Sequence, residues 1–321
     1  MKDQWGRIIE YVRVSLTDAC NFACPYCRPE EIPPEAVNNL LTVEEWMTIL
    51  EAFHRLGVKA VRLTGGEPLL YPYLDQLLES IKDRGWFQDI SMTTNASLLG
   101  MRAKHLQDLG LDRVNISLDS LDPVLFAQAV GKEGQMEAVL AGIEAAMEAG
   151  FKSVKINTVL VRAWSDQEVA SLLAYIEKWP VIWRFIEYMP FQGDTFKGPS
   201  FEEWMDQLAR VVGAPLEEVQ GVGGFGPASY YRLPSGKIIG CIFSMSHSYC
   251  DSCNRLRLTA DGKMRLCLLQ DGEVNLIHRV RRGDSVKALM TFIEGSLGAK
   301  KEGHQGPSMD QPQRPMWKIG G

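Results

Sequence analysis

The sequence predicts an α/β fold: a partial, open barrel of six β/α units, of the TIM type, followed by a smaller C-terminal α+β region. Two observations predict this fold. Short β-rich apolar runs recur at intervals of roughly 25–40 residues, and most stretches between them have the apolar spacing of helices. Such alternation builds a parallel sheet with helices outside it, and six units fall short of the eight that close a TIM barrel. The alternation stops after about Phe201, so we expect a barrel over residues 1–215 and a second region over residues 216–321.

The individual elements follow from local patterns. The expected barrel strands are residues 11–16, 60–64, 89–93, 113–118, 153–160 and 182–188. The first helix opens with Thr42 and Glu45 as a capping box, and helical spacing recurs over 74–81 and over 136–149, which Gly150 closes. In the second region the pattern predicts antiparallel strands at 230–232 and 238–243, joined by a turn at 234–236, and helix over 274–297.

Composition limits the classes of partner. The chain has 321 residues, and its 40 acidic and 34 basic side chains give a net charge of −6. Nucleic-acid binding favours a basic surface, and no apolar run here approaches the ~18 residues of a membrane span. The first residues contain no apolar signal core. We therefore expect a cytoplasmic protein that binds neither nucleic acid nor membrane.

Seven cysteines form two close-spaced groups and one isolated residue. An odd number without a secretion signal argues against a disulfide framework. Cys20, Cys24 and Cys27 directly follow the first expected strand, and loops at the C-terminal ends of parallel strands build active sites. Three close thiolates can hold three irons of a four-iron cluster and leave the fourth iron open to another ligand. A zinc loop and unligated cysteines are the alternatives.

The second group, Cys250, Cys253 and Cys267, again offers three thiolates. The alternative to an iron–sulfur cluster is a structural zinc site completed by His247, three residues before the group. The isolated Cys241 lies in an expected strand, where we expect it to be a small buried hydrophobe.

The first group resembles the signature of the radical S-adenosylmethionine (SAM) enzymes. Its spacing is Cys-x3-Cys-x2-Cys with an aromatic Tyr26, and the second expected strand ends in Gly65-Gly66-Glu67-Pro68, a run that alone is also typical of an ordinary turn. The resemblance implies that the methionine part of SAM chelates the open iron, and that an electron from the cluster cleaves the sulfonium to give a 5′-deoxyadenosyl radical. It assigns the SAM contacts to Tyr26, Gly66, Ser117 and Met189, although Met189 alone also suits a core position.

The second group resembles the C-terminal motif of the GTP 3′,8-cyclase family, which catalyses the first step of molybdenum cofactor biosynthesis. From residue 253 the chain reads Cys-Asn-Arg-Leu-Arg-Leu-Thr-Ala-Asp-Gly-Lys. Further matching runs are residues 6–7, 16–21, 93–95, 115–119, 154–159, 184–190, 226–231 and 319–321. The resemblance implies two [4Fe-4S] clusters, one on each cysteine group, with the open iron of the second meeting the guanine of the substrate.

The same resemblance assigns the GTP contacts. They are Arg13, Arg62, Thr93, Lys155, Arg184, Arg255, Leu256 and Arg257. A triphosphate carries about four negative charges, which Arg and Lys side chains in a barrel lumen hold by charge-assisted hydrogen bonds. Four of these cations (Arg13, Arg62, Lys155 and Arg184) lie in expected strands, where a charge is costly unless it faces a ligand or partner. Each of them alone also suits an edge position or a salt bridge.

No glycine loop in the sequence is predicted to cradle the phosphates. The Gly-Lys pairs at 131, 236 and 262 lack the Ser or Thr that follows in a Walker loop. Glycines 221, 223 and 226 formally fit a dinucleotide fingerprint, but strands and no helix are expected after them.

The C-terminal Gly320-Gly321 would be a frayed end on composition alone. The resemblance implies that both glycines reach into the active site and take part in rearrangement of the substrate, with Arg255 and Arg257 as the other catalytic positions. Backbone without side chains can approach a ligand closely. Two residues depart from the family pattern: Ala96 replaces a glycine, which would strain a positive φ, and Arg28 replaces an apolar residue after the first cysteine group.

Together these features predict a radical SAM lyase that cyclises GTP to (8S)-3′,8-cyclo-7,8-dihydroguanosine 5′-triphosphate. The expected partners are GTP, a reductant protein and the next enzyme of molybdopterin synthesis, with the chain a monomer or homodimer. Two rivals are a radical SAM enzyme with an auxiliary cluster acting on a peptide, and a non-enzymatic iron–sulfur electron carrier. A carrier would have four thiolates per cluster, whereas both groups here have three.

Overall fold

The computed structural model describes residues 1–27, 40–190, 198–270, 272–303, 314 and 316–319. Six strands, each parallel to its neighbour, form the first part of the sheet. They are β1 (Tyr11–Ser15), β2 (Ala60–Thr64), β3 (Asp89–Thr94), β4 (Arg113–Ser117), β5 (Ser153–Val159) and β6 (Ile182–Ile186). The predicted open, six-unit barrel is confirmed, and each of the six predicted barrel strands begins at the residue where the structure begins it.

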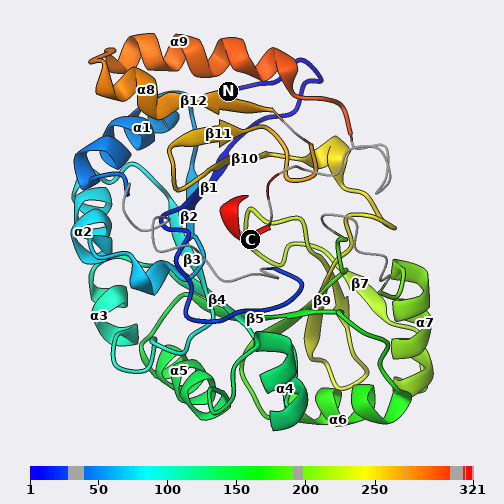
Figure 1. The fold of residues 1–321 in the computed structure, drawn as a ribbon. Helices are drawn as coiled ribbons and strands as arrows, with labels where there is room; N and C mark the ends of the chain where they lie inside the picture. Colours follow the sequence, from blue (N-terminus) through cyan, green and yellow to red (C-terminus); the bar gives the residue numbers. More distant parts are fainter. Residues whose placement is uncertain (28–39, 191–197, 271, 304–313, 315, 320–321) are drawn as a thin grey trace.

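Helices surround this sheet on its outer side (Figure 1). They are α1 (Val43–Arg55), α2 (Leu74–Arg84), α3 (Ala103–Asp108), α4 (Pro123–Val130), α5 (Met136–Glu148), α6 (Asp166–Ile176) and α7 (Phe201–Val212), with a 3-10 turn η2 (Pro68–Leu70). The capping box predicted for α1 is present, since Thr42 accepts a hydrogen bond from the Glu45 N–H and the Glu45 carboxylate accepts one from the Thr42 N–H. One face of α1, including Trp46 and Phe53, is fully buried against the sheet.

The C-terminal part of the chain extends the same sheet at both of its edges. Its elements are β7 (Glu217–Val219), β8 (Ser229–Arg232), β9 (Ile238–Ile242), η3 (Cys250–Ser252), β10 (Arg255–Leu258), β11 (Lys263–Arg265), β12 (Glu273–Asn275), α8 (Leu276–Arg281), α9 (Val286–Ser296), η4 (Leu297–Ala299) and η5 (Met316–Ile319). The strand order is β12-β11-β10-β1-β2-β3-β4-β5-β6-β9-β8-β7. Strand β10 is parallel to β1, and β9 is parallel to β6.

Most sequence expectations for this region are confirmed. Strands β8 and β9 are antiparallel, as predicted, and no helix follows glycines 221, 223 and 226 before β8. The helical prediction for 274–297 is correct except at its start, where residues 273–275 form β12, and at 282–285, which separate α8 from α9. Cys241 is buried in β9, as expected.

The strands point their charged residues to the lumen because side chains alternate along a strand. In β1, Val12 and Val14 join the hydrophobic core beneath the helices, so Arg13 between them faces the opposite side. The same alternation turns Arg62, Arg184 and Arg257 to the lumen. The period-2 apolar pattern therefore builds the core on one face and a cationic lumen on the other.

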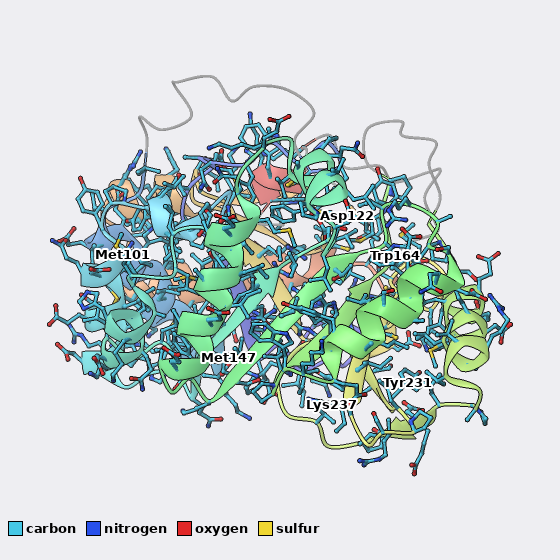
Figure 2. All side chains as sticks on the ribbon, turned by 90° about the horizontal axis from the view of Figure 1, so that it is seen from below. Met101, Asp122, Met147, Trp164, Tyr231 and Lys237 are labelled. Atoms are coloured by element: carbon cyan, nitrogen blue, oxygen red, sulfur yellow. The ribbon has the colours of Figure 1, made fainter. Side chains whose placement is uncertain are left out.

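The C-terminal ends of the strands form one side of the molecule. Asp122 and Trp164, which follow β4 and β5, lie toward the upper side in Figure 2, and Met147 and Lys237, which precede β5 and β9, lie toward the lower side. Among the described helices, none has the length and apolar composition needed to cross a bilayer.

Candidate active site

A large open cavity lies inside the barrel. The empty volume of this cavity, counted together with the open space at its mouth, is about 1690 Å³. The predicted site residues on its wall are Arg13, Cys20, Cys24, Tyr26, Cys27, Arg62, Gly66, Thr93, Ser117, Arg184, Met189, Arg255 and Arg257. The structure therefore brings the first cysteine group, all four predicted SAM contacts and five arginines to one cavity.

The first cysteine group forms a turn on the cavity wall. The Cys27 N–H donates to the Cys24 carbonyl oxygen at 3.0 Å, and the Phe22 N–H lies 3.5 Å from the Cys20 Sγ. Burial, with Asp119 and the two neighbouring thiols, raises the pKa of Cys24 well above its usual value. Among the described residues no three His, Cys, Asp or Glu side chains converge on one metal ion. A four-iron cluster takes each thiolate on a different iron, so three thiols around one turn suit it.

The Gly-Gly-Glu-Pro run packs directly on this cysteine loop. The Gly66 N–H donates to the Thr17 carbonyl oxygen, and the Glu67 N–H donates to the Ala19 carbonyl oxygen, both at 2.7 Å. A Cβ on Gly66 would lie 2.2 Å from the Ala19 oxygen, and a Cβ on Gly65 would lie 2.6 Å from the Thr17 oxygen. Both glycines are thus required by a close approach of two backbones, which an ordinary turn would not require.

Three buried carboxylates that we did not predict as site residues connect the loops at the strand ends. Glu67, after β2, accepts hydrogen bonds from the Leu69 and Asn95 N–H groups and from the Thr94 hydroxyl, at 2.8–3.0 Å. Burial raises its pKa to about 7. Glu187, after β6, accepts from the N–H groups of residues 245 and 246, which follow β9. The available signal was an acidic residue at the end of an apolar strand.

The third carboxylate, Asp119, joins the cysteine loop to the barrel. It accepts a hydrogen bond from the Tyr26 hydroxyl at 2.8 Å and another from the Val159 N–H at 2.8 Å. Burial raises the pKa of Asp119 to about 6. Because Tyr26 immediately precedes Cys27, this bond fixes the side of the cysteine loop that carries a predicted SAM contact.

Five arginines make the lumen strongly cationic. Burial, and then the charges of neighbouring arginines, lower the pKa of Arg184 and of Arg257 to about 10 and lower the pKa of Arg13 well below its usual value. Polar side chains accept hydrogen bonds from Arg184 and Arg62. Arg184 donates to Asn157 at 2.9 Å and to Asn115 at 2.5 Å, and Arg62 donates to Ser91 at 3.2 Å. A polyanion would offset this mutual repulsion.

Two buried hydroxyls on the wall are also available to a ligand. The Thr93 Oγ1 and the Tyr11 hydroxyl make no hydrogen bond to any residue that the structure describes. Buried hydroxyls normally have a partner, so these two atoms can bind a polar group in the cavity. Thr93 was predicted as a GTP contact; Tyr11 was missed because a tyrosine at the start of a strand has no distinguishing pattern.

Two predicted GTP contacts lie off the cavity wall. Lys155, in the first half of β5, donates to the Tyr230 hydroxyl at 2.8 Å and to the Gly223 carbonyl oxygen at 3.1 Å, and it lines a second hollow. Leu256 is fully buried in the core, because alternation in β10 turns it away from Arg255 and Arg257. Neither side chain reaches the large cavity as the other predicted contacts do.

The second cysteine group lies just behind the cavity wall. Cys250, Cys253 and Cys267 are half-buried, and their chain neighbours Tyr249 and Leu268 line the cavity. The Cys253 N–H donates to the Cys250 carbonyl oxygen at 3.1 Å. The exposed His247 ring stacks on Phe201 of α7, with ring centroids 4.5 Å apart. Service as a fourth ligand would compete with this stacking.

The C-terminal segment ends in the middle of the barrel, where η5 (red) lies inside the ring of strands (Figure 1). Met316 and Trp317 of η5 line the cavity, and Arg257 donates to the Ile319 carbonyl oxygen at 3.4 Å. Residues 316–319 are thus packed inside the lumen. The predicted catalytic pair Gly320-Gly321 lies outside the described residues.

The two departures from the family pattern have different outcomes. Ala96 has a φ of 61°, so it adopts the left-handed conformation that we expected to strain an alanine. It is fully buried beside the Thr94-Asn95 turn. Arg28 lies outside the described residues.

Comparisons with known proteins agree along the whole chain. Residues 14–176 match the family described as Radical SAM superfamily, and residues 181–306 match the family described as Molybdenum Cofactor Synthesis C. The chain is 36% identical over 323 residues to the GTP 3′,8-cyclase of Peptoclostridium acidaminophilum, covering 99% of this chain and 98% of that protein. It is 38% identical over 330 residues to molybdenum cofactor biosynthesis protein 1 of Homo sapiens, covering 99% of this chain and 51% of that protein.

A solved structure gives a likeness of fold. Streptococcus suis SuiB bound to S-adenosylmethionine superposes with a TM-score of 0.65 at 15% sequence identity, over 94% of this chain and 76% of that one. At this identity the similarity concerns the fold alone. It agrees with the barrel and with the sheet that continues beyond it.

Proposed function

The chain belongs to the GTP 3′,8-cyclase family of radical SAM enzymes, and from this premise we propose that it converts GTP to (8S)-3′,8-cyclo-7,8-dihydroguanosine 5′-triphosphate. One observation supports this proposal above the others: a single cavity wall carries the Cys20–Cys27 loop, Gly66 and five arginines. The peptide-modifying and electron-carrier alternatives do not account for a cationic lumen of this kind.

Cys20, Cys24 and Cys27 would hold the first [4Fe-4S] cluster, with SAM on the open iron. Tyr26, Gly66, Ser117 and Met189 would hold SAM, since all four line the wall beside that loop. When bound, the cluster and SAM would supply the radical that removes hydrogen from the ribose C3′. C3′ would then bond to C8 of the guanine as the C8–N7 double bond opens, and one electron from the reductant with one proton would complete N7. The hydrogen bonds that Glu67 and Asp119 accept from the surrounding loops would keep these contacts in place.

GTP would lie deeper in the lumen, with its phosphates toward the arginines. Arg13, Arg62, Arg184, Arg255 and Arg257 supply the charge, and the free Thr93 hydroxyl supplies a donor. Each charge-assisted hydrogen bond contributes about 1.5–3 kcal/mol, so losing one should weaken GTP binding by about 10- to 100-fold. Leu256 would contribute only its backbone. Lys155 would need to exchange Tyr230 for a phosphate oxygen.

Cys250, Cys253 and Cys267 would hold a second [4Fe-4S] cluster, whose open iron would meet the guanine. The neighbouring wall residues Tyr249, Arg255 and Leu268 support this placement, because they put the second group next to the lumen. Gly320 and Gly321 would extend from Ile319 toward the substrate.

We further propose a cytoplasmic enzyme, monomeric or homodimeric, whose two regions divide near residue 215. It would take electrons from a reductant protein and pass its product to the next enzyme of molybdopterin synthesis.

The decisive experiment is anaerobic. Reconstituted, reduced protein is mixed with SAM, with and without GTP, and 5′-deoxyadenosine and a cyclic GTP-derived product are followed by mass spectrometry. Both products should appear together only with GTP. SAM cleavage without loss of GTP would indicate another substrate, and intact SAM with intact clusters would favour an electron carrier.

Variants with matched controls test the residues. Cys24→Ala should lose about half of the iron and all SAM cleavage, whereas Cys241→Ala, in the buried core of β9, should lose neither. Arg255→Ala and Arg257→Ala should keep the iron and weaken GTP binding about 10- to 100-fold. A loss of iron from the two arginine variants would contradict their assignment to the substrate.

A further inference from the structure

Lys300 is a buried lysine in the second cysteine region to which the proposed reaction gives no role. The residue is 3% exposed, and its ammonium donates hydrogen bonds to the Leu266 carbonyl oxygen and, at 3.3 Å, to the Arg255 carbonyl oxygen. Leu266 immediately precedes Cys267, and Arg255 follows Cys253 by two residues. The ammonium thus bridges the two chain segments that carry the second cysteine group.

The backbone around Lys300 is held as firmly as its side chain. Its carbonyl oxygen accepts hydrogen bonds from the Trp5 indole at 2.8 Å and from the Gln4 amide at 3.1 Å. Three residues later, a Cβ on Gly303 would lie 3.4 Å from the Cys250 Cβ, so this segment also packs on the remaining cysteine. The segment 300–303 therefore lies against the chain segments that carry the three cysteines.

Within the described part of the chain, no carboxylate offsets the charge of Lys300. Among the residues that the structure describes, no Asp or Glu lies within ion-pair distance of its ammonium, although a buried cation normally has such a partner. The buried Arg7, which donates to the carbonyl oxygens of Cys250, Lys301 and Glu302, is paired with Asp3 at 2.7 Å. Lys300 differs from Arg7 in this one respect.

Lys300 lies between the two chain segments that carry the thiols of the second group. Its ammonium bonds the backbone one residue before Cys267 and two residues after Cys253. Three thiolates on a [4Fe-4S] core of charge about 2+ would give the half-buried site a net charge of about −1, which a neighbouring cation offsets. A lysine that also bonds both flanking backbones fixes where those thiolates point.

We propose that Lys300 is the counter-cation and positioning residue of the second [4Fe-4S] cluster, neutralising its thiolates and holding the Cys253 and Cys267 segments together. This inference rests on the second cluster of the proposed function. It assigns Lys300 to the assembly and retention of that cluster, and it gives Lys300 no contact with GTP or SAM.

Iron content tests the proposal. Each variant is reconstituted anaerobically, and iron and sulfide are counted per chain. The parent chain should hold about eight irons and Lys300→Met, which keeps the length and removes the charge, about four, while the electron paramagnetic resonance signal of the SAM-bound first cluster stays. Lys300→Arg should retain more iron than Lys300→Met, and Lys287→Met, an exposed control in α9, should match the parent. Full iron in Lys300→Met would overturn the proposal.

A second parent chain, which lacks the second cysteine group, keeps the test valid if Lys300→Met folds poorly. In a chain with Cys250, Cys253 and Cys267 replaced by Ala, Lys300 is a buried charge with no anion, so adding Lys300→Met should raise the melting temperature or leave it unchanged. A lower melting temperature of Lys300→Met in that chain would show that Lys300 only holds the two backbone segments together. It would overturn the proposal that Lys300 offsets the charge of the cluster. A parent chain with about four irons would overturn the second cluster itself, with the first cluster and SAM cleavage unaffected.

Discussion

Arg13 of β1 lies directly beside Arg257 of β10, in register across a parallel ladder that joins the first strand to the C-terminal part of the chain. On its other side Arg13 is in register with Arg62 of β2. Like charges directly opposite each other destabilise a sheet, and all three side chains face the lumen. This row is therefore a site of stored repulsion that a bound polyanion relieves.

Replacing Arg257 by Met should stabilise the protein without GTP and weaken its binding of GTP. Removing the repulsion should add about 0.2–1 kcal/mol to the free energy of unfolding, and removing the hydrogen bond to phosphate should raise the Kd for GTP about 10- to 100-fold. Thermal melting with and without GTP measures both effects. Arg232→Met, an exposed arginine on β8 that lies 3.7 Å from Glu217, is the control and should change neither. A GTP-free melting temperature lower than that of the parent would contradict the prediction.

The sequence could predict the strands and the lumen because both depend on local alternation. Val12-Arg13-Val14 is a strand with one charged face whatever its neighbours are. The sequence could not predict that β10 would pair with β1, because strand register across such a separation depends on the whole sheet. For the same reason Lys155, although in a charged strand position, ends beside Tyr230 and outside the large cavity.

Site residues could be predicted where a local sequence motif identifies them. They were missed where their role depends on a hydrogen-bond partner that is distant in the sequence. The cysteine loop was found from its spacing, and Gly66 was found because that loop and the Gly-Gly-Glu-Pro run together resemble the radical SAM signature. Glu67 and Asp119 stood in the same motifs, but their roles depend on Asn95 and Tyr26, which other loops supply. The position of η5 in the cavity likewise has no local signal.

Ala96→Gly should change the free energy of unfolding by less than about 1 kcal/mol. At a φ of 61° an alanine costs about 1–2 kcal/mol, but Gly removes a buried methyl and gains freedom in the unfolded chain. Ala96→Val, whose branched side chain suits this φ worse still, should destabilise by more than about 2 kcal/mol. Urea unfolding of the three proteins measures the differences. A large loss of stability in Ala96→Gly would mean that strain is absent.

Glu67 should make stability fall as the pH rises. Burial raises its pKa from 4.5 to about 7, so between these values the folded chain binds more protons than the unfolded chain. By linkage the free energy of unfolding then decreases with pH across this window and is constant above it. Glu67→Gln cannot titrate at this position. From about pH 4.5 to 7, the free energy of unfolding of the parent should therefore fall by about 2–3 kcal/mol relative to that of the variant. Melting curves at intervals across this range test it, and parallel curves would contradict it.

The pairing of Arg314 with Asp261 and Glu273 should hold the C-terminal segment in the cavity. Its guanidinium makes two hydrogen bonds to Asp261, at 3.0 and 2.8 Å, and its Nε lies 2.8 Å from Glu273. Because η5 begins at Met316 and its first two residues line the cavity, releasing Arg314 should free η5 from the wall. Arg314→Ala should lower the rate of GTP cyclisation by about tenfold or more while the iron content stays unchanged.

Limited trypsin digestion checks this release independently of activity. Cleavage after Lys318, followed by mass spectrometry, should be about tenfold or more faster in Arg314→Ala, because each 1.4 kcal/mol removed from the pairing raises the open population about tenfold. Asp261→Asn should have a smaller effect in the same direction, and the double variant should be no faster than Arg314→Ala, since both changes remove one interaction. Additive effects of the two changes would show that Asp261 and Arg314 act separately, and an unchanged cleavage rate would show that other contacts hold η5.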